Sequence, residues 1–325
     1  MATAIAGSPE STCTVVAGRD AARLEDFRAR HGIARATTSV DDAVAGDDVD
    51  VVYVGVPNHL HSEMVAKAAH AGKAVLSEKS LTISMSQADE LLTAVDGKVF
   101  FVEGLMYLAH PVLARFVEVL TDGRLGELRA INASYVADIA HLVNPLGRGA
   151  IYNLGCYPAS LVQLVVDQFG GESTFEDRKL VAAGTISLTD TNVTESVAAV
   201  RFANRTLATL HTAETYGSSS HFEIQGTNGT LRFVTNPWLP RAGESTFVWT
   251  GFDGSHEAIT VQSPLDAFDH QVRMVETNLR ASRLEAQRPS PRLRDSRALM
   301  AFLTEWEAAV RHGTGFELDG SGHLR

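Results

Sequence analysis

Short apolar runs alternate with segments of helical spacing through the first hundred residues. The apolar runs are CTVVAG (13–18), VDVVYVGVP (49–57), AVLSEK (74–79) and KVFFVEG (98–104). The segments between them with apolar residues at helical spacing include residues 20–32, 61–73 and 84–95. Strand and helix alternating at this spacing are typical of parallel βαβ units. We therefore predict a Rossmann-like, doubly wound parallel sheet over residues 1–104.

The pattern changes after residue 104. A helical segment (110–123) leads into a strand-like one (126–139), and alternating strand segments with turn residues between them fill residues 179–263. Two further helices are expected near 264–283 and 294–312. A run of strands bordered by helices predicts an α+β domain over residues 105–325 with a large, open, mostly antiparallel sheet. We expect the last helices to pack back on the first domain.

Composition excludes several classes of protein. With 325 residues, 45% of them hydrophobic, the chain can bury a large core. A formal net charge of -11 argues against nucleic acid as a main partner, because phosphate binding needs clustered Lys and Arg. No apolar run approaches the ~18 residues of a membrane helix, and no secretory signal is visible. Only two cysteines occur, Cys13 and Cys156, so we expect a reducing, cytoplasmic setting without disulfides.

Polar residues follow two successive predicted strands. VGVPNHLHSEMV (54–65) places Pro57, Asn58 and His61 after one strand, and SEKS (77–80) places Glu78 and Lys79 after the next. Alone, the first stretch is equally well explained as a helix cap and the second as solvated surface. The carboxyl ends of parallel strands, however, lie on one edge of the sheet, where ligands bind in such folds. The coincidence favours a functional site.

A third stretch, PLGRGAIYNLGCYPASLVQLV (145–165), is rich in glycine at the start of a predicted helix. Asn153 and Tyr157 are four residues apart and would share one face of an α-helix. This pattern is consistent with the wall of a binding site. It is also consistent with a tightly packed helix on which Tyr157 is half-buried core.

Taken together, these stretches resemble the glucose–fructose oxidoreductase, inositol dehydrogenase and MocA (Gfo/Idh/MocA) family of nicotinamide-dependent dehydrogenases. VGVPNHLHSEMVAKAAHAGKAVLSEKSL (54–81) is similar to the family's strand–Pro–Asn–x–x–His–helix–AGKHVLCEKP signature. GRGAIYNLGCYP (147–158) resembles its GGGALxDxGxH/Y segment, EIQGTNGTLRF (223–233) resembles its GTxGxL turn, and residues 290–306 resemble a late helix. The resemblance covers nearly the whole chain.

The resemblance implies a role for each matching residue. Lys79 would lie beside the substrate hydroxyl or carbonyl, where it can exchange a proton or hold a developing alkoxide. Tyr157 matches the family's acid/base position. Asn153 matches a position that is more often Asp, and its amide can hydrogen-bond a sugar hydroxyl but cannot take a proton. The cofactor groove would be lined by Gly18, Arg19, Val56, Pro57, Asn58, His61, Glu78, Lys79 and Glu103.

The implied activity is hydride transfer between NADP or NAD and a sugar, cyclitol or related diol. An acidic residue at the end of the second strand usually marks NAD, whereas Gly18 is followed here by Arg19, which favours NADP. Candidate substrate-contacting residues are Tyr107, His110, His141 and Arg148, although Arg148 can equally be a surface residue. A sheet with one uncovered face predicts a homodimer or homotetramer formed sheet to sheet.

The sequence also departs from the family. No G-x-G-x-x-G occurs, although a dinucleotide fold needs such a loop to meet the pyrophosphate. Compared with the usual strand–loop–helix opening, about 25 to 30 residues with the central strand are expected to be missing. A start codon placed too late would explain this. So would a non-catalytic binding or regulatory relative that has lost normal cofactor binding. Ser80 replaces the family's proline, which would relax the turn after Lys79.

Overall fold

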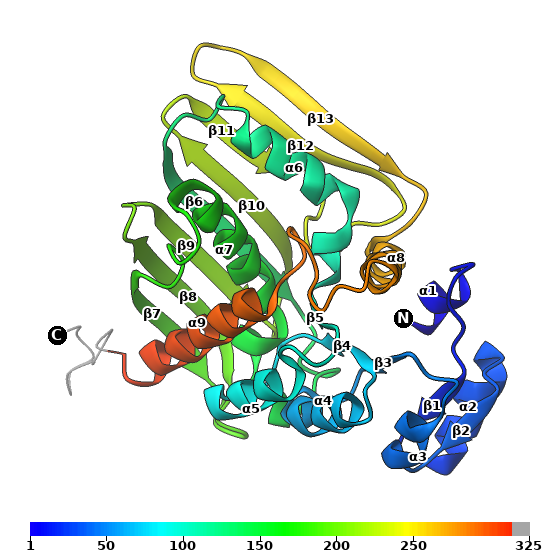
Figure 1. Cartoon of the computed structure of the whole chain (residues 1–325). Coiled ribbons are helices and arrows are strands. Elements are labelled where there is room, and N and C mark those ends of the chain that lie inside the picture. Colours follow the sequence, from blue (N-terminus) through cyan, green and yellow to red (C-terminus); the bar gives the residue numbers. More distant parts are fainter. Residues whose placement is uncertain (314–325) are drawn as a thin grey trace. The chain divides into compact units, whose positions relative to one another are not determined.

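The chain folds into two compact units. The computed structural model describes residues 1–313 (Figure 1). Unit 1 comprises Met1–Ala114, Pro240–Gly243 and Gln262–Arg297. Unit 2 comprises Arg115–Leu239, Glu244–Val261 and the described residues from Ala298 onward.

Unit 1 is built mainly from the N-terminal third of the chain, together with helix α8 and the start of helix α9. Its elements are α1 (Ala2–Ala6), β1 (Val15–Ala17), α2 (Ala21–His31), β2 (Arg35–Thr37), α3 (Val40–Ala45), β3 (Val51–Val54), η1 (Asn58–Leu60), α4 (His61–His70), β4 (Ala74–Glu78), α5 (Met85–Val95), β5 (Phe101–Gly104), η2 (Met106–Ala109), α8 (Ala267–Arg280) and the beginning of α9 (Leu293–Arg311).

Local signals set the helix ends of unit 1. The side chain of Asp20 accepts hydrogen bonds from the backbone N–H groups of Ala22 and Arg23, which caps the start of α2. Helix α2 ends at Gly32, whose φ of 64° lies in the left-handed region that glycine adopts without strain. Ser84 caps α5 in the same way as Asp20 caps α2. The helices therefore begin and end close to the positions that the sequence predicts.

The strands of unit 1 are parallel, as predicted, but they form two sheets rather than one. Strand β1 pairs with β2, and separately β3 pairs with β4 and β4 with β5. Within the described residues, no ladder joins β1 to β3. Parallel strands bond only to neighbours about 4.8 Å away, and no strand of the described chain bridges these two edges. The predicted fold class of this part of the chain, a Rossmann-like arrangement of parallel strands, is confirmed.

The core of unit 1 draws on both ends of the chain. Leu76 of β4 and Val102 of β5 are 4% and 1% exposed and belong to one apolar cluster with Phe100, Val275 and Ala286. Val275 lies on α8, so a C-terminal helix buries apolar surface with the N-terminal strands. Burial of such side chains supplies most of the stability of a parallel sheet.

Unit 2 contains a broad sheet and its covering helices. Its elements are the main part of α6 (Pro111–Thr121), β6 (Leu128–Ala137), η3 (Pro145–Gly147), η4 (Ile151–Gly155), α7 (Cys156–Gly170), β7 (Arg178–Ile186), β8 (Val193–Phe202), β9 (Leu207–Ala213), β10 (Ser218–Gly226), β11 (Gly229–Phe233), β12 (Gly243–Gly251), β13 (His256–Ser263) and the main part of α9.

The eight strands lie in the order β13-β12-β11-β10-β6-β9-β8-β7. Strands β6 and β9 are parallel, with Ala130 opposite Leu207, while the pairs β10–β11, β10–β6, β11–β12, β7–β8 and β8–β9 are antiparallel. The prediction of an α/β chain with a large, open, mostly antiparallel sheet in its C-terminal part is thus confirmed.

Helices α6, α7 and α9 lie against one face of this sheet (Figure 1). Phe116 of α6 packs its ring on those of Phe222, Phe233 and Phe247, with centroids 4.9 to 6.1 Å apart. Trp306 of α9 is fully buried, and its indole N–H donates to Ser196 Oγ at 2.8 Å. These aromatic side chains form the main core of unit 2.

The other face of the sheet carries apolar side chains that are exposed in the described chain. Val181, Val197 and Leu207, on β7, β8 and β9, are 69%, 50% and 54% exposed. Gatherings of exposed apolar residues on a sheet commonly mark interaction surfaces. Separately, none of the described helices is both long enough and apolar enough to span a lipid bilayer.

The aromatic cluster yields a stability prediction. Replacing Phe116, which is 0% exposed, with alanine leaves a cavity and should lower the free energy of unfolding by about 3–5 kcal/mol. Phe252 is 69% exposed and provides the control, since its replacement should change stability by no more than about 0.5 kcal/mol. Urea unfolding followed by tryptophan fluorescence measures both. Equal midpoint shifts for the two variants would contradict the packing described.

Candidate active site

Four polar residues gather where β4 and β5 end, and we call them the edge cluster: Ser77, Glu78, Lys79 and Glu103. The strand register places Ser77 opposite Glu103 and Glu78 opposite Gly104. A Cβ on Gly104 would lie only 3.0 Å from the Ser77 carbonyl oxygen, so the close approach of the two strands needs glycine there. Strand β3 is the parallel neighbour of β4 on its other side. The site roles predicted for Pro57 and Lys79, which follow these two strands, stay predictions.

Glu103 is the most buried acid of the edge cluster, at 1% exposure. Its Oε2 atom has no hydrogen-bond partner among the described residues, and neither does the buried Ser77 Oγ. Burial raises the pKa of the Glu103 carboxyl to about 7. The negative charge of Glu78 adds to this shift, and the positive charge of Lys79 opposes it. Glu103 can therefore exist in either protonation state near neutral pH.

Glu78 is held by two hydrogen bonds. The Tyr53 hydroxyl donates to Glu78 Oε1 at 2.8 Å, and the backbone N–H of Lys79 donates to Glu78 Oε2 at 3.3 Å. Burial, with the charge and hydrogen bond of Glu78, raises the pKa of the Tyr53 phenol well above its usual range. Lys79 itself is half-buried, and its peptide bond to Ser80 is cis.

His61 connects the loops that follow β3 and β4. Its ring is 1% exposed, with Nε2 2.9 Å from the Val56 carbonyl oxygen and Nδ1 3.0 Å from that of Ser80. Burial lowers the pKa of His61, although its carbonyl contacts oppose the shift. Because His61 holds the buried Ser80, contacts in the structure take over the turn-fixing role expected of a proline. His61 thus positions both loops rather than presenting its ring to solvent.

The other predicted cofactor residues lie in two loops of unit 1. Pro57 is half-buried and Asn58 is 9% exposed, at the start of η1. Gly18 follows β1 and donates its N–H to the Thr37 carbonyl oxygen at 3.2 Å. Arg19 is exposed, and the next residue, Asp20, is already engaged as the cap of α2.

These residues fit one half of a nicotinamide dinucleotide. The unpartnered oxygens of Ser77 and Glu103, with the Lys79 ammonium, offer donors and acceptors at the edge where such cofactors place the nicotinamide. The pyrophosphate half normally binds a G-x-G-x-x-G loop, and the sequence contains none. The described strands that would flank such a loop, β1 and β3, belong to separate sheets.

Asn153 and Tyr157, the two catalytic residues predicted in unit 2, contact different side chains. Residues Ile151–Gly155 form a π-helical turn, so Asn153 precedes the α-helix on which Tyr157 lies. The expectation that they share one face of an α-helix assumed regular geometry that this turn lacks. The Asn153 amide donates to Glu214 Oε2 at 2.7 Å. The Tyr157 ring, 6% exposed, packs edge-on against Tyr135, with centroids 5.2 Å apart.

The predicted substrate residues occupy diverse environments. Tyr107 and His110 of unit 1 are 0% and 1% exposed, whereas His141 of unit 2 lies exposed in the loop before η3. Arg148 forms an ion pair with the buried Glu307 at 2.6 Å and covers the ring of Tyr152. This ion pair gives Arg148 a structural partner within the chain itself.

Sequence reasoning missed a pocket of unit 2 that contains Glu214, a buried acid just after β9. It also missed the pocket residues Ser187, Asp190, Asn192 and Thr194 around the start of β8. The available signal was a carboxylate at the end of an alternating strand, in HTAET (211–215). Nothing in the sequence showed that Glu214 meets Asn153, because 61 residues separate them.

Comparison with known proteins identifies the family. An oxidoreductase-family model with an NAD-binding Rossmann fold matches residues 2–103, and the GFO/IDH/MocA C-terminal domain matches residues 113–232. The chain belongs to the GFO/IDH/MocA family of NAD(P)-dependent oxidoreductases. The resemblance found in the sequence is thereby confirmed for the family and for its Rossmann-type domain.

Individual relatives are more distant. The chain is 34% identical to oxidoreductase ORF334 of Rhizobium meliloti over 156 residues, 46% of this chain and 47%, or about half, of that protein. It is 28% identical to trans-1,2-dihydrobenzene-1,2-diol dehydrogenase of Xenopus tropicalis, covering 69% and 68% of the two chains.

Among solved structures, a 3-ketoreductase of Actinomadura kijaniata in complex with TDP-benzene and NADP has a TM-score of 0.79 at 25% identity. The match covers 96% of this chain and 92% of that one. A levoglucosan dehydrogenase in complex with NADH and levoglucosan shares the fold, with a TM-score of 0.78 at 18% identity over 96% and 93% of the chains.

The raised pKa of Glu103 predicts a pH-dependent difference between the native protein and Glu103→Gln. A carboxyl whose pKa is raised on folding stabilises the fold while protonated; this contribution is complete below its ordinary value of 4.5 and lost as pH rises through about 7. Glutamine does not titrate. From pH 4.5 to 8 the native protein should therefore lose on the order of 3 kcal/mol relative to Glu103→Gln. Chemical denaturation of both proteins across this range measures the difference, and a constant difference would contradict the assignment.

Proposed function

We propose that this protein transfers a hydride between a nicotinamide cofactor, NADP or NAD, and a sugar, cyclitol or related diol. The observation that carries the proposal is the edge cluster, in which a lysine and two acids gather where adjacent parallel strands end. Membership of an oxidoreductase family supports the reaction class. When bound, the nicotinamide ring supplies the site that accepts or donates the hydride.

The chain's own residues would handle the proton. Lys79 exchanges the hydroxyl proton of the substrate or stabilises a developing alkoxide, because an ammonium can do both within hydrogen-bond reach. Tyr157 is the second proton-handling group, and Asn153 hydrogen-bonds a hydroxyl without taking its proton. Glu78, fixed by Tyr53, and the buried Glu103 would orient the lysine and the nicotinamide ribose. Pro57 and Asn58 would line the nearby cofactor groove.

The similar proteins support the class of substrate. The 3-ketoreductase, the dihydrodiol dehydrogenase and the levoglucosan dehydrogenase are named for reactions of carbonyl or hydroxyl carbons. We therefore propose a polyol or sugar as the substrate of this chain as well. The exposed apolar face of the unit 2 sheet supports the further proposal of a homodimer or homotetramer.

Lys79→Ala should lower kcat by about 10²–10⁴-fold with NADP(H) and the best substrate of a sugar and polyol panel, because general acid–base groups contribute this much. The melting temperature should stay unchanged, since Lys79 is only half-buried. Lys67→Ala is the matched control, because Lys67 forms surface ion pairs on α4 and should keep full activity. Near-native turnover of the Lys79 variant would remove this residue from the chemistry.

We propose NADP as the preferred cofactor, because Arg19 is exposed after β1 while Asp20 is engaged in capping α2. Arg19→Ala should lower the ratio of kcat/KM for NADPH over NADH by about tenfold, the value of one charge-assisted hydrogen bond to a 2′-phosphate. Arg23→Ala, in the first turn of the neighbouring helix α2, should leave the ratio unchanged. An unaltered ratio in the Arg19 variant, or a native preference for NADH, would contradict the assignment.

The divided parallel sheet favours a second candidate function, a binding or regulatory relative without normal catalysis. In the described chain β1 and β3 are not hydrogen-bonded to each other, and no phosphate-binding loop connects to either strand. Titration of NADPH followed by nicotinamide fluorescence separates the functions. No change at millimolar cofactor would favour the second.

A further inference from the structure

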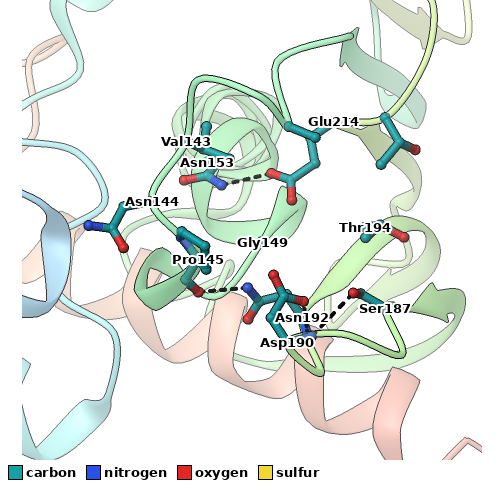
Figure 2. Close-up of a pocket in the computed structure, with 12 residues that line it drawn as sticks. Val143, Asn144, Pro145, Gly149, Asn153, Ser187, Asp190, Asn192, Thr194 and Glu214 are labelled. Carbon is teal, nitrogen blue, oxygen red and sulfur yellow. Dashed lines mark hydrogen bonds between the residues drawn. The ribbon is translucent and has the colours of Figure 1, made fainter.

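Unit 2 contains a pocket with a volume of about 180 Å³ (Figure 2). It is formed by the loop before the π-helical turn, the start of that turn, the segment between β7 and β8, and the residues just after β9. The residues that line it are Ala140, Val143, Asn144, Pro145, Gly149, Asn153, Ser187, Asp190, Asn192, Thr194, Glu214 and Thr215.

Most of the side chains that line the pocket carry a polar group, and two of them are acidic. Two carboxylates, three carboxamides and three hydroxyls contribute to it, and these twelve described residues include no Lys, Arg or His. Carboxamides and hydroxyls can each donate and accept hydrogen bonds, while a carboxylate only accepts. Such a surface matches a ligand rich in hydroxyl groups. It offers an anionic ligand no compensating positive charge.

Glu214 lies at the buried side of the pocket, with 4% exposure. The Asn153 amide donates to its Oε2 at 2.7 Å, and the two side chains point toward one another in Figure 2. The backbone is fixed as well, because the N–H groups of Ile139 and Ala140 donate to the Glu214 carbonyl oxygen at 2.9 and 2.8 Å. The carboxylate therefore has a defined position in the pocket.

The exposed side of the pocket adds a second negative charge. The backbone N–H of Asn192 and the hydroxyl of Ser187 hydrogen-bond Asp190 and lower the pKa of its carboxyl. Asn192 is held in turn, since its amide donates to the Pro145 carbonyl oxygen at 2.6 Å. Gly149 lets this loop approach β8, where a Cβ would lie 2.4 Å from the Val193 carbonyl oxygen.

A metal ion is not the ligand that this pocket suggests. Among the described residues, no group of three or more His, Cys, Asp or Glu side chains could hold a metal ion. The hydrogen bond from Asn153 fixes the Glu214 carboxylate as an acceptor. A fixed acceptor of this kind is typical of a site that binds a ligand hydroxyl.

We propose that this pocket binds an uncharged, polyhydroxylated ligand and that Glu214 determines its charge specificity. The Glu214 carboxylate accepts a hydrogen bond from a ligand hydroxyl, while Glu214 and Asp190 together disfavour sugar acids and sugar phosphates. A site rejects a competing ligand most strongly when binding would bury the charge of that ligand beside protein charges of the same sign. This inference rests on the proposed function, which supplies the class of ligand. It adds that Glu214 contacts the ligand and that the pocket selects uncharged ligands over anionic ones.

Isothermal titration calorimetry with D-glucose and D-glucuronate tests this proposal, because the two ligands differ only in a hydroxymethyl or a carboxylate group. The native protein should bind D-glucose at least about tenfold more tightly. Glu214→Gln keeps the size of the side chain but removes its charge, so it should weaken D-glucose binding by about tenfold and bring the two affinities close together. Asp190→Asn should reduce the difference in affinity between D-glucose and D-glucuronate. Because Asp190 is exposed, this variant should fold normally.

Glu127→Gln is the control, because Glu127 forms an exposed ion pair with Arg129 and does not line the pocket. It should bind both ligands as the native protein does. Equal or tighter binding of D-glucuronate by the native protein, unchanged selectivity in both the Glu214 and Asp190 variants, or binding of neither sugar would overturn the proposal.

The calorimetry needs no hydride transfer, so the two proposals fail separately. A chain that selects D-glucose through Glu214 but turns over no substrate with either cofactor would refute only the proposed function. A chain with dehydrogenase activity that prefers D-glucuronate would refute only the charge selection.

Discussion

The hydrogen-bond register between β4 and β5 is the constraint on which the edge cluster depends. It places Ser77 opposite Glu103 and brings the next two residues, Glu78 and Lys79, to the end of the same pair of strands. A shift of one residue would turn Glu103 to the other face of the sheet. The buried apolar cluster under these strands fixes the register, and Gly104 lets the strand ends approach. The raised pKa of Glu103 is a consequence of this packing, because the same burial withdraws its carboxyl from water.

The divided parallel sheet has consequences for cofactor binding. Strands β1–β2 and β3–β4–β5 form separate ladders, and in the described chain β1 and β3 each have a partner strand on one edge only. Unpaired strand edges invite a further strand. Under the proposed function, the residues that follow β3, β4 and β5 would contact a nicotinamide and its ribose, whereas a pyrophosphate needs a loop of backbone N–H groups. The described chain thus has candidate residues for the nicotinamide half of a dinucleotide but no glycine-rich loop for the pyrophosphate half. Whether the chain binds the whole cofactor therefore decides between a dehydrogenase and a non-catalytic relative.

Much of the fold was predictable because it depends on local patterns. Apolar runs and helical spacing located β3, β4, α4 and α5. The carboxyl-edge rule was applied to Pro57 and Lys79, and β3 and β4, which precede them, are indeed parallel neighbours. The site in unit 2 was predicted less well for two physical reasons. The π-helical turn at 151–155 replaces regular α-helix, which no spacing rule indicates. Arg148 is held by Glu307, a partner 159 positions later, and Asn153 by Glu214. Such long-range pairs depend on how the sheet brings strand ends together, and one sequence does not contain that information.

The central claim is that the edge cluster binds the nicotinamide end of the cofactor. Saturation-transfer difference NMR with millimolar NADPH tests it directly, because the method reports which ligand protons touch the protein even when binding is weak. The account predicts strong saturation of the nicotinamide ring and its ribose protons, and a clear loss of that signal in Lys79→Ala. Saturation confined to the adenine protons, or none at all, would contradict it.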